Sequence, residues 1–308
     1  MRAFIFPGQG SQTVGMGAAL AEASRAARDV FDEVDEALGQ NLFRLMREGP
    51  DEELKLTENA QPAIMAHSVA VLRTLGVALS DIANSVAGHS LGEYSALCAA
   101  GSFDLATTAK LLKLRGQAMQ QAVPVGVGAM AALLGADLKL AQKIAEAAAE
   151  GEICTVANDN DPSQVVISGH KGAIDRAIAI ARDMGAKRAV ALPVSAPFHC
   201  PLMQPAARAM RDALSNVVVE EPAVPLYTNV TAEAQTDPDT IRSQLVEQVT
   251  GMVRWRESVA NLFDSGVHEF VEIGGKVLGP MVKRIAPDAK IASVVTIEDI
   301  ELLAREIT

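Results

Sequence analysis

The stretch Gly88-His89-Ser90-Leu91-Gly92-Glu93-Tyr94 decides how we interpret the rest of this chain. It follows the short apolar run Ser85-Val86-Ala87 and precedes residues 91–100, which have a helical pattern. The Gly-x-Ser-x-Gly sequence therefore lies at a predicted turn from a strand to a helix, which is the context of a nucleophile elbow. There a serine hydroxyl projects beyond the sheet, and the free amides of the helix N-terminus face any negative charge that develops. The alternative is a glycine-flanked serine in an ordinary turn.

Composition indicates a globular protein with a full core. The chain has 308 residues, of which 49% are hydrophobic and 21% charged, and its length suits one large domain or two. No apolar run approaches the roughly 20 residues that span a bilayer, and the N-terminus is too short and too early broken by Pro7 to resemble a secretory signal. Three widely spaced cysteines, without a Cys-x-x-Cys pair, favour a reducing cytoplasm over a disulfide framework or a zinc site.

The net charge of −11 argues against nucleic acid as the main partner, because binding a phosphate backbone needs many basic side chains on one face. Aromatic residues make up only 4% of the chain, so base stacking is not supported either. An acidic partner remains possible through a local basic patch.

The first elements are a predicted strand at residues 4–6 and a glycine-rich loop at residues 7–12. The loop lacks the ending of a P-loop and the spacing of a dinucleotide fingerprint, so we favour a role in bringing a backbone N–H close to a substrate. Helices are predicted at residues 17–38, 51–56, 61–75 with Pro62 in the first turn, and 105–121 with Asp104 as N-cap.

A glycine-rich linker at residues 124–128 separates this region from a different pattern. A strand, a helix, two strands, a helix and a strand are predicted at 130–134, 137–150, 153–157, 164–168, 172–184 and 189–194. This is the order of a ferredoxin-like unit, here inserted into a larger domain.

After the insertion, helices and strands alternate again. We predict helices at 201–214, 240–250 and 257–265, and strands at 224–227 and 269–273. Alternation on both sides of the insertion indicates a parallel sheet. The predicted fold is α/β, with a large α/β-hydrolase-like catalytic domain formed by residues 1–124 and 196–308 and a small ferredoxin-like α+β domain at residues 125–195.

A serine hydroxyl needs a base, and the chain has five histidines. His199 is the best candidate because its loop, bracketed by Pro197 and Pro201, lies at the predicted domain boundary, where ligand clefts are common. The alternative is a histidine that only caps the following helix. His89 adjoins Ser90 and should point away from it, and the other three histidines suit packing or capping: His67 as a hydrogen-bonded core residue, His170 and His268 at junctions between elements.

Two questions stay open at the level of single residues. An acidic residue or a backbone carbonyl could orient the histidine ring, and no local signature selects one. Arg115, in an otherwise apolar stretch, either lies on the wet face of its helix or pairs with an anion in a cleft, where its planar fork matches a carboxylate.

These motifs together resemble the bacterial malonyl-CoA:acyl carrier protein transacylase family over essentially the whole chain. The matching segments, in the family's order, are residues 6–12, 61–63, 88–94, 115–116, 128–130, 158–169, 197–199, 253–255 and 276–278. The resemblance implies Ser90 as the nucleophile, His199 as its base, and the main-chain carbonyl of Gln248 as the group that orients the base.

The resemblance also implies the substrate-binding groups. The amides of Gln9 and Leu91 would form the oxyanion hole, Arg115 would bind the free malonyl carboxylate, Gln61 and Gln164 would lie near the pocket, and bulky Phe198 would exclude methylmalonyl groups. Malonyl-CoA and acyl carrier protein are the implied partners, with no metal or other cofactor, no nucleic acid and no membrane. We expect a cytoplasmic monomer that supplies fatty acid synthesis.

The sequence departs from the family pattern in three places. Gly251-Met252 stands where a proline is usual, which puts in doubt how rigidly Gln248 is held; the turn 274–276 is one residue short, and Cys200 replaces a frequent serine. The rival functions are a serine esterase or thioesterase, for which Arg115 would have no use, and a non-catalytic protein that only binds carrier proteins.

Overall fold

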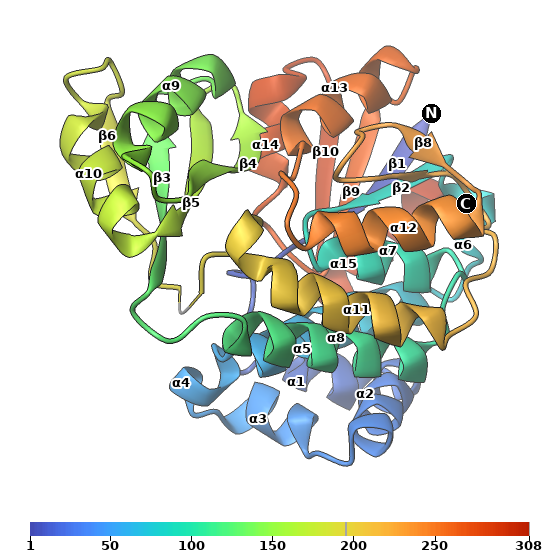
Figure 1. Ribbon diagram of the computed structural model, residues 1–308. Coiled ribbons are helices and arrows are strands. Elements are labelled where there is room, and N and C mark those ends of the chain that lie inside the picture. Colours follow the sequence, from blue (N-terminus) through green and yellow to red (C-terminus); the bar gives the residue numbers. More distant parts are fainter. Residues whose placement is uncertain (195, 308) are drawn as a thin grey trace.

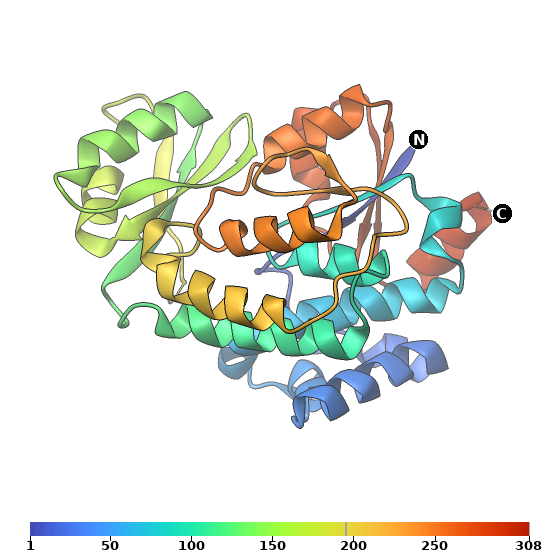
Figure 2. The ribbon, with the colours of Figure 1, turned by 45° about the vertical axis from the view of Figure 1, so that its right-hand side comes forward.

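A computed structural model describes residues 1–194 and 196–307 (Figure 1). Ser195, at the predicted domain boundary, and the last residue, Thr308, lie outside the described residues. Two separate sheets organise the described chain, and the smaller one lies to one side of the larger one (Figures 1 and 2).

The larger sheet has six strands in the order β10-β9-β1-β2-β7-β8. Every neighbouring pair is parallel except β7 and β8, so the predicted parallel sheet is confirmed. The strands are β1 (Arg2–Phe6), β2 (Ser85–Gly88), β7 (Leu226–Tyr227), β8 (Ala234–Gln235), β9 (Glu269–Ile273) and β10 (Lys290–Val294).

Helices cover both faces of this sheet because its strands are apolar on both sides. Along β1, Phe4 and Phe6 enter one hydrophobic core, whereas Ala3 and Ile5 enter another on the opposite face. The helices of this part of the chain, some of which pack on other helices and not on the sheet, are α1 (Ala18–Ala23), α2 (Arg25–Leu38), α3 (Leu42–Glu48), α4 (Asp51–Leu54), α5 (Thr57–Leu75), α6 (Leu79–Ile82), α7 (Gly92–Ala99), α8 (Leu105–Gln121), the 3₁₀ turn η1 (Pro201–Met203), α11 (Gln204–Ser215), α12 (Pro238–Gln248), α13 (Trp255–Asp264), α14 (Gly279–Ile285) and α15 (Ile297–Ile307).

The smaller sheet is antiparallel, with the order β4-β5-β3-β6. Helices α9 and α10 pack against it around a core of its own, so the predicted order of strands and helices in this region is confirmed. Its elements are β3 (Gly128–Leu134), α9 (Leu138–Ala149), β4 (Cys154–Asp161), β5 (Gln164–His170), α10 (Lys171–Ala181) and β6 (Arg188–Ala191).

Several predicted boundaries were wrong. The helix expected at 17–38 is divided at Ser24, whose hydroxyl caps α2 by accepting from the amide of Ala27. Helix α5 begins at Thr57, so Pro62 lies inside the helix and not in its first turn. The start was missed because buried polar residues such as Asn59 interrupt the apolar pattern.

In the smaller sheet, β4 continues to Asp161 because its pairing with β5 resumes after irregularities. Strand β6 ends at Ala191, before Pro193, which has no amide to donate. Helices α3, α6, α14 and α15 and strands β8 and β10 were not predicted.

Within the described residues, no helix combines the length and the apolar character that crossing a membrane requires.

Candidate active site

Ser90 lies in the sharp turn between β2 and α7, with a left-handed backbone (φ 54°) that non-glycine residues rarely adopt. The flanking glycines are required by close backbone contacts. A Cβ at Gly88 would lie 1.9 Å from the carbonyl oxygen of Gly92, and a Cβ at Gly92 would lie 2.2 Å from that of Phe6. The predicted strand-turn-helix context of the serine is therefore confirmed.

His199 comes from the loop between the two sheets, and the fold brings its ring to Ser90. Its Nε2 lies 2.8 Å from the Ser90 Oγ, and its Nδ1 lies 2.8 Å from the main-chain oxygen of Gln248. A carbonyl oxygen can only accept, so Nδ1 carries the proton and Nε2 offers its lone pair to the hydroxyl. The open choice between an acid and a carbonyl is thus settled geometrically in favour of the carbonyl.

Burial, and then the positive charge of Arg115, lower the pKa of His199 to about 3. The imidazole is therefore neutral at pH 7, the state in which it can accept the serine proton.

Arg115 projects from α8 into the same site and is 1% exposed, which excludes the wet-face interpretation. Its Nη2 donates to the Ser90 Oγ at 3.1 Å and to the Gln248 Oε1 at 2.8 Å, and its Nη1 donates to the Gln61 Oε1 at 2.8 Å. The guanidinium thus has neutral acceptors around it, and among the described residues it forms no ion pair. A buried cation in this state is well suited to binding a carboxylate.

Two residues of the site were missed by the sequence analysis. Asn229, in the loop after β7, accepts from the amide of Ser90 at 2.7 Å and donates to the oxygen of Gly88 at 2.7 Å, so it braces the elbow. Glu93, buried on α7, contacts Gln248. Glu93 lies in the elbow stretch and could have been singled out there, whereas nothing in the sequence around Asn229 points to it.

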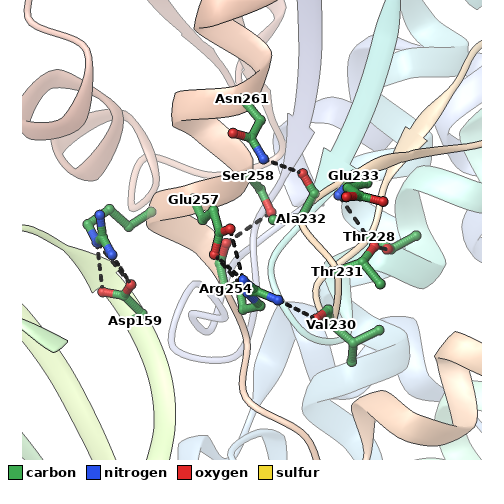
Figure 3. Close-up of polar contacts among 11 residues, drawn as sticks. Asp159, Thr228, Val230, Thr231, Ala232, Glu233, Arg254, Glu257, Ser258 and Asn261 are labelled. Atoms are coloured by element: carbon green, nitrogen blue, oxygen red, sulfur yellow. Dashed lines mark hydrogen bonds and ion pairs between the residues drawn. The ribbon is translucent and has the colours of Figure 1, made fainter. Parts of the chain in front are cut away.

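Residues at the start of α13 form hydrogen bonds to the loop that carries Asn229 (Figure 3). The amide of Arg254 donates to the Asn229 oxygen at 2.9 Å, and the guanidinium reaches the oxygen of Val230 at 3.3 Å while bonding to Glu257 at 2.7 Å. This explains the presence of an arginine before Trp255 at the start of the helix.

A cavity of about 400 Å³ opens on Ser90, between the two sheets. The larger part of the molecule contributes Gln9, Gln61, Leu91, Arg115 and His199 to its lining, and Phe198 adds an aromatic wall. The smaller sheet contributes Met130 and Asn158, and the segment that follows β6 contributes Leu192. The structure thus gathers eight of the nine residues expected at the site, counting Ser90 itself and Gln248 behind His199.

Gln164 is the exception, and the expectation that it lies near the pocket needs correction. It begins β5 opposite Leu134, at the end of β3 away from Met130, and it is not among the residues that line the cavity. Asn158, which belongs to the same matching segment, faces the cavity from β4 in its place.

The remaining histidines lie apart from the serine hydroxyl. His89 bonds to Asn160 at 2.9 Å, and His170 accepts from the amide of Ile153 at 2.9 Å. His67 is buried as predicted, but its Nδ1 has no partner among the described residues, so the expected hydrogen bond was wrong for that atom.

Comparison with known proteins agrees with this geometry. The family model of the acyl transferase domain matches residues 3–281. The malonyl CoA-acyl carrier protein transacylase of Escherichia coli (strain K12) is 46% identical over 284 residues, which are 92% of this chain and 92% of that protein.

Two solved structures extend the comparison. The acyl-carrier-protein-S-malonyltransferase of Bartonella henselae has a TM-score of 0.97 and 52% identity, with 99% of each chain covered. A malonyl-transacylase solved in complex with a type II PKS acyl-carrier protein has a TM-score of 0.96 and 40% identity, also with 99% of each chain covered. This chain therefore belongs to the acyl transferase domain family and, within it, to the malonyl CoA-acyl carrier protein transacylases.

Proposed function

We propose that this enzyme moves the malonyl group of malonyl-CoA to the phosphopantetheine thiol of an acyl carrier protein, through a malonyl-serine intermediate, and so supplies fatty acid synthesis. The observation that carries the proposal is the meeting of three groups: the Ser90 hydroxyl lies 2.8 Å from the neutral His199 and 3.1 Å from the buried guanidinium of Arg115. Ser90 and His199 together supply a nucleophile, and the guanidinium of Arg115 selects an acyl group that ends in a carboxylate.

In the first half-reaction, His199 Nε2 takes the proton of the Ser90 hydroxyl as Oγ attacks the thioester carbonyl carbon. The resulting oxyanion accepts hydrogen bonds from the amides of Gln9 and Leu91, both of which line the cavity. The C–S bond then breaks, the proton passes from His199 to the CoA sulfur, and malonyl-Ser90 remains. The oxyanion hole matters to the rate, since losing one donor typically costs about 10²–10³-fold.

In the second half-reaction, the carrier-protein thiol gives its proton to His199 and attacks malonyl-Ser90. Collapse of the second tetrahedral intermediate breaks the C–Oγ bond and returns the proton to Ser90. CoA leaves while the malonyl group is still bonded to Ser90, before the carrier protein reacts, so the kinetics are ping-pong. Charges balance throughout, and the residues require no metal or prosthetic group for these steps.

Two side chains would set acyl selectivity. Arg115 would exchange its bonds to Gln61, Gln248 and Ser90 for bonds to the malonyl carboxylate. Phe198, nearly buried in the cavity wall, would leave no room for the additional methyl of methylmalonyl.

The finer description of the fold belongs to the same proposal. Residues 1–124 and 196–308 would form an α/β-hydrolase-like catalytic domain, and residues 125–195 an inserted ferredoxin-like domain, with the cavity between them. The enzyme would act as a cytoplasmic monomer, without binding nucleic acid or a membrane surface.

The test is a transfer assay with malonyl-CoA in the presence and absence of carrier protein bearing phosphopantetheine. We expect malonyl transfer to the carrier protein and only slow release of free malonate without it. Rapid, steady malonate release without an acceptor would support a thioesterase and overturn the transferase.

A further inference from the structure

Glu93 is a buried acid beside the site that the proposed mechanism does not use. It lies in the first turn of α7, three residues after Ser90, and is 1% exposed. Within residues 1–194 and 196–307, no lysine or arginine forms an ion pair with it. Its Oε2 accepts from the Gln248 Nε2 at 2.7 Å and from the amide of Asn229 at 3.2 Å, whereas its Oε1 has no partner among these residues.

Gln248 connects this acid to the two groups that would do the chemistry. Its side-chain Oε1 accepts from Arg115 at 2.8 Å, and its main-chain oxygen accepts from His199 Nδ1 at 2.8 Å. Its Nε2 also donates to the main-chain oxygen of Ser90 at 2.9 Å. One glutamine, the last residue of α12, thus contacts acid, base, cation and nucleophile.

We propose that Glu93 is a positioning residue that holds Gln248 by its side chain, so that the carboxamide oxygen of Gln248 orients Arg115 and its main-chain oxygen orients His199. This inference rests on the proposed function, because it assigns Glu93 a part in that reaction.

The physical reason is the near-symmetry of a carboxamide. The oxygen and the NH₂ of a glutamine have almost the same shape, so packing alone does not choose between its two orientations. The flipped orientation would place NH₂ against the guanidinium of Arg115, donor against donor. The Glu93 Oε2 lies nearest to the Gln248 Nε2, at 2.7 Å, ahead of the main-chain oxygen of Ser90 at 2.9 Å and the Asn229 Oδ1 at 3.3 Å. With its NH₂ on this side, Gln248 presents its oxygen to Arg115.

The acceptor function does not depend on the charge of Glu93. Burial raises the pKa of this carboxyl to about 7, against the opposing effects of Gln248, Asn229 and Arg115. In the protonated form the proton can occupy Oε1, which has no partner among the described residues, and Oε2 remains an acceptor for Gln248 and Asn229.

This leads to a matched pair of variants. Glu93→Gln keeps an oxygen at the Oε2 position and places its NH₂ where Oε1 has no partner, whereas Glu93→Met fills a similar volume without an acceptor. The measurement is kcat and KM for acyl transfer from malonyl-CoA and from acetyl-CoA, scaled to the fraction of protein that is folded by circular dichroism.

For Glu93→Met we expect kcat to fall on the order of ten- to a hundredfold with both donors, the factor typical of one lost hydrogen bond to a charged or buried group. KM should rise for malonyl-CoA but not for acetyl-CoA, because only malonyl uses Arg115. Glu93→Gln should restore most of the loss in kcat and KM.

Glu272→Gln is the control for burial of a carboxylate. Glu272 is also fully buried, but it accepts from the amides of Val277, Leu278 and Gly279 at the start of α14, away from Gln248. This variant should be less stable, but its kcat and KM should change by the same factor with malonyl-CoA and with acetyl-CoA.

The inference is overturned if folded Glu93→Met keeps wild-type kcat and KM, or if Glu93→Gln is as impaired as Glu93→Met. Should Glu93→Met not fold, Gln248→Leu removes the carboxamide from the other side and must show the same split between malonyl and acetyl. Failure of the wild-type enzyme to transfer malonyl at all would contradict the proposed function instead.

Discussion

At the scale of single residues, the site depends on a buried cation whose hydrogen-bond partners are neutral. Arg115 donates hydrogen bonds to Gln61, Gln248 and the Ser90 hydroxyl. Its Cζ also lies 5.7 Å from the centroid of the Tyr94 ring, which adds a cation-π interaction. Burying a guanidinium whose hydrogen-bond partners are neutral costs free energy. A substrate carboxylate would recover part of that cost, which gives the cation its selectivity.

We predict that Arg115→Ala lowers kcat/KM for malonyl-CoA by at least about a hundredfold, the worth of a charge-assisted bond to a buried partner. With acetyl-CoA the loss should be much smaller, because acetyl has no carboxylate. The measurement is the ratio of the two kcat/KM values. Equal losses with both donors would show that Arg115 has a structural role only.

His67 gives a prediction for stability against pH. Burial lowers its pKa to about 4, below the ordinary value of 6.5. The unfolded chain therefore binds a proton at pH 5 that the folded chain does not, and the stabilisation is present above pH 6.5 and is lost as the pH falls toward 4.

Replacing His67 with Gln should remove this contribution. The free energy of unfolding of the wild type should fall with decreasing pH between 6.5 and 4, and the variant should show a slope smaller by up to about 1.4 kcal/mol per pH unit, the value for one proton. Urea unfolding at a series of pH values measures both slopes. If the free energy of unfolding changes with pH equally in both proteins, His67 does not take up a proton on unfolding, and the prediction is wrong.

At the scale of elements, local signals of the sequence were sufficient where one residue acts on its own neighbours. Asp104 caps α8 as predicted, by accepting from the amide three residues on, and Asp137 caps α9 in the same way, although only the start of that helix was predicted. The glycines of the elbow could also be predicted locally, because the backbone contacts that leave no room for a Cβ come from the turn itself and from the adjacent strand.

The local sequence pattern did not identify residues whose hydrogen-bond partners lie far along the chain. Asn229 lies 139 positions from Ser90 and has no local motif. The start of α5 was missed because the polar side chains of Asn59 and Gln61 find partners on α8, Lys113 and Arg115, which no pattern within α5 reveals. Gln248 and Gln9 could be assigned only through family resemblance, since the role expected of each uses a main-chain group that every residue type has.

The N-cap of α8 should affect the stability of the protein but not its selectivity between acyl groups. We predict that Asp104→Ala lowers the free energy of unfolding by about 1 kcal/mol, because it removes the acceptor for the amide of Thr107. The ratio of malonyl to acetyl kinetics should stay unchanged, since Arg115 lies about three turns further along α8. Thermal unfolding and the two transfer assays measure both quantities, and a changed ratio would mean that α8 shifts as a body.

At the scale of the whole molecule, β4 attaches the smaller sheet to the rest of the protein. Asp161, fully buried, bonds to Arg284 of α14 at 2.8 Å, and Asp159, nearly buried, bonds to Arg256 of α13 at 2.8 Å (Figure 3 shows Asp159). Next to Asp159, a backbone bridge joins Asn158 to Val253. Because Asn158 also lines the cavity, the same strand attaches the sheet and shapes the site.

We predict that Arg284→Ala lowers the free energy of unfolding by about 1–3 kcal/mol, because among the described residues it leaves the side chain of buried Asp161 with only its bonds to Ser163. Adding Asp161→Asn to Arg284→Ala should recover part of that loss. A double-mutant cycle by urea unfolding measures the coupling. Purely additive losses would show that the ion pair contributes nothing to the attachment.

In the mechanism that we propose, Ser90, activated by His199, carries the malonyl group, and the other predictions on acyl transfer depend on this claim. Its most direct test is the intact mass of the protein after mixing with malonyl-CoA, followed by peptide mapping of the adduct, with Ser90→Ala as control. We expect the wild-type protein to gain the mass of one malonyl group on the peptide containing Ser90, and the variant to gain none. An adduct of equal extent on Ser90→Ala, or its location on another residue, would contradict the account.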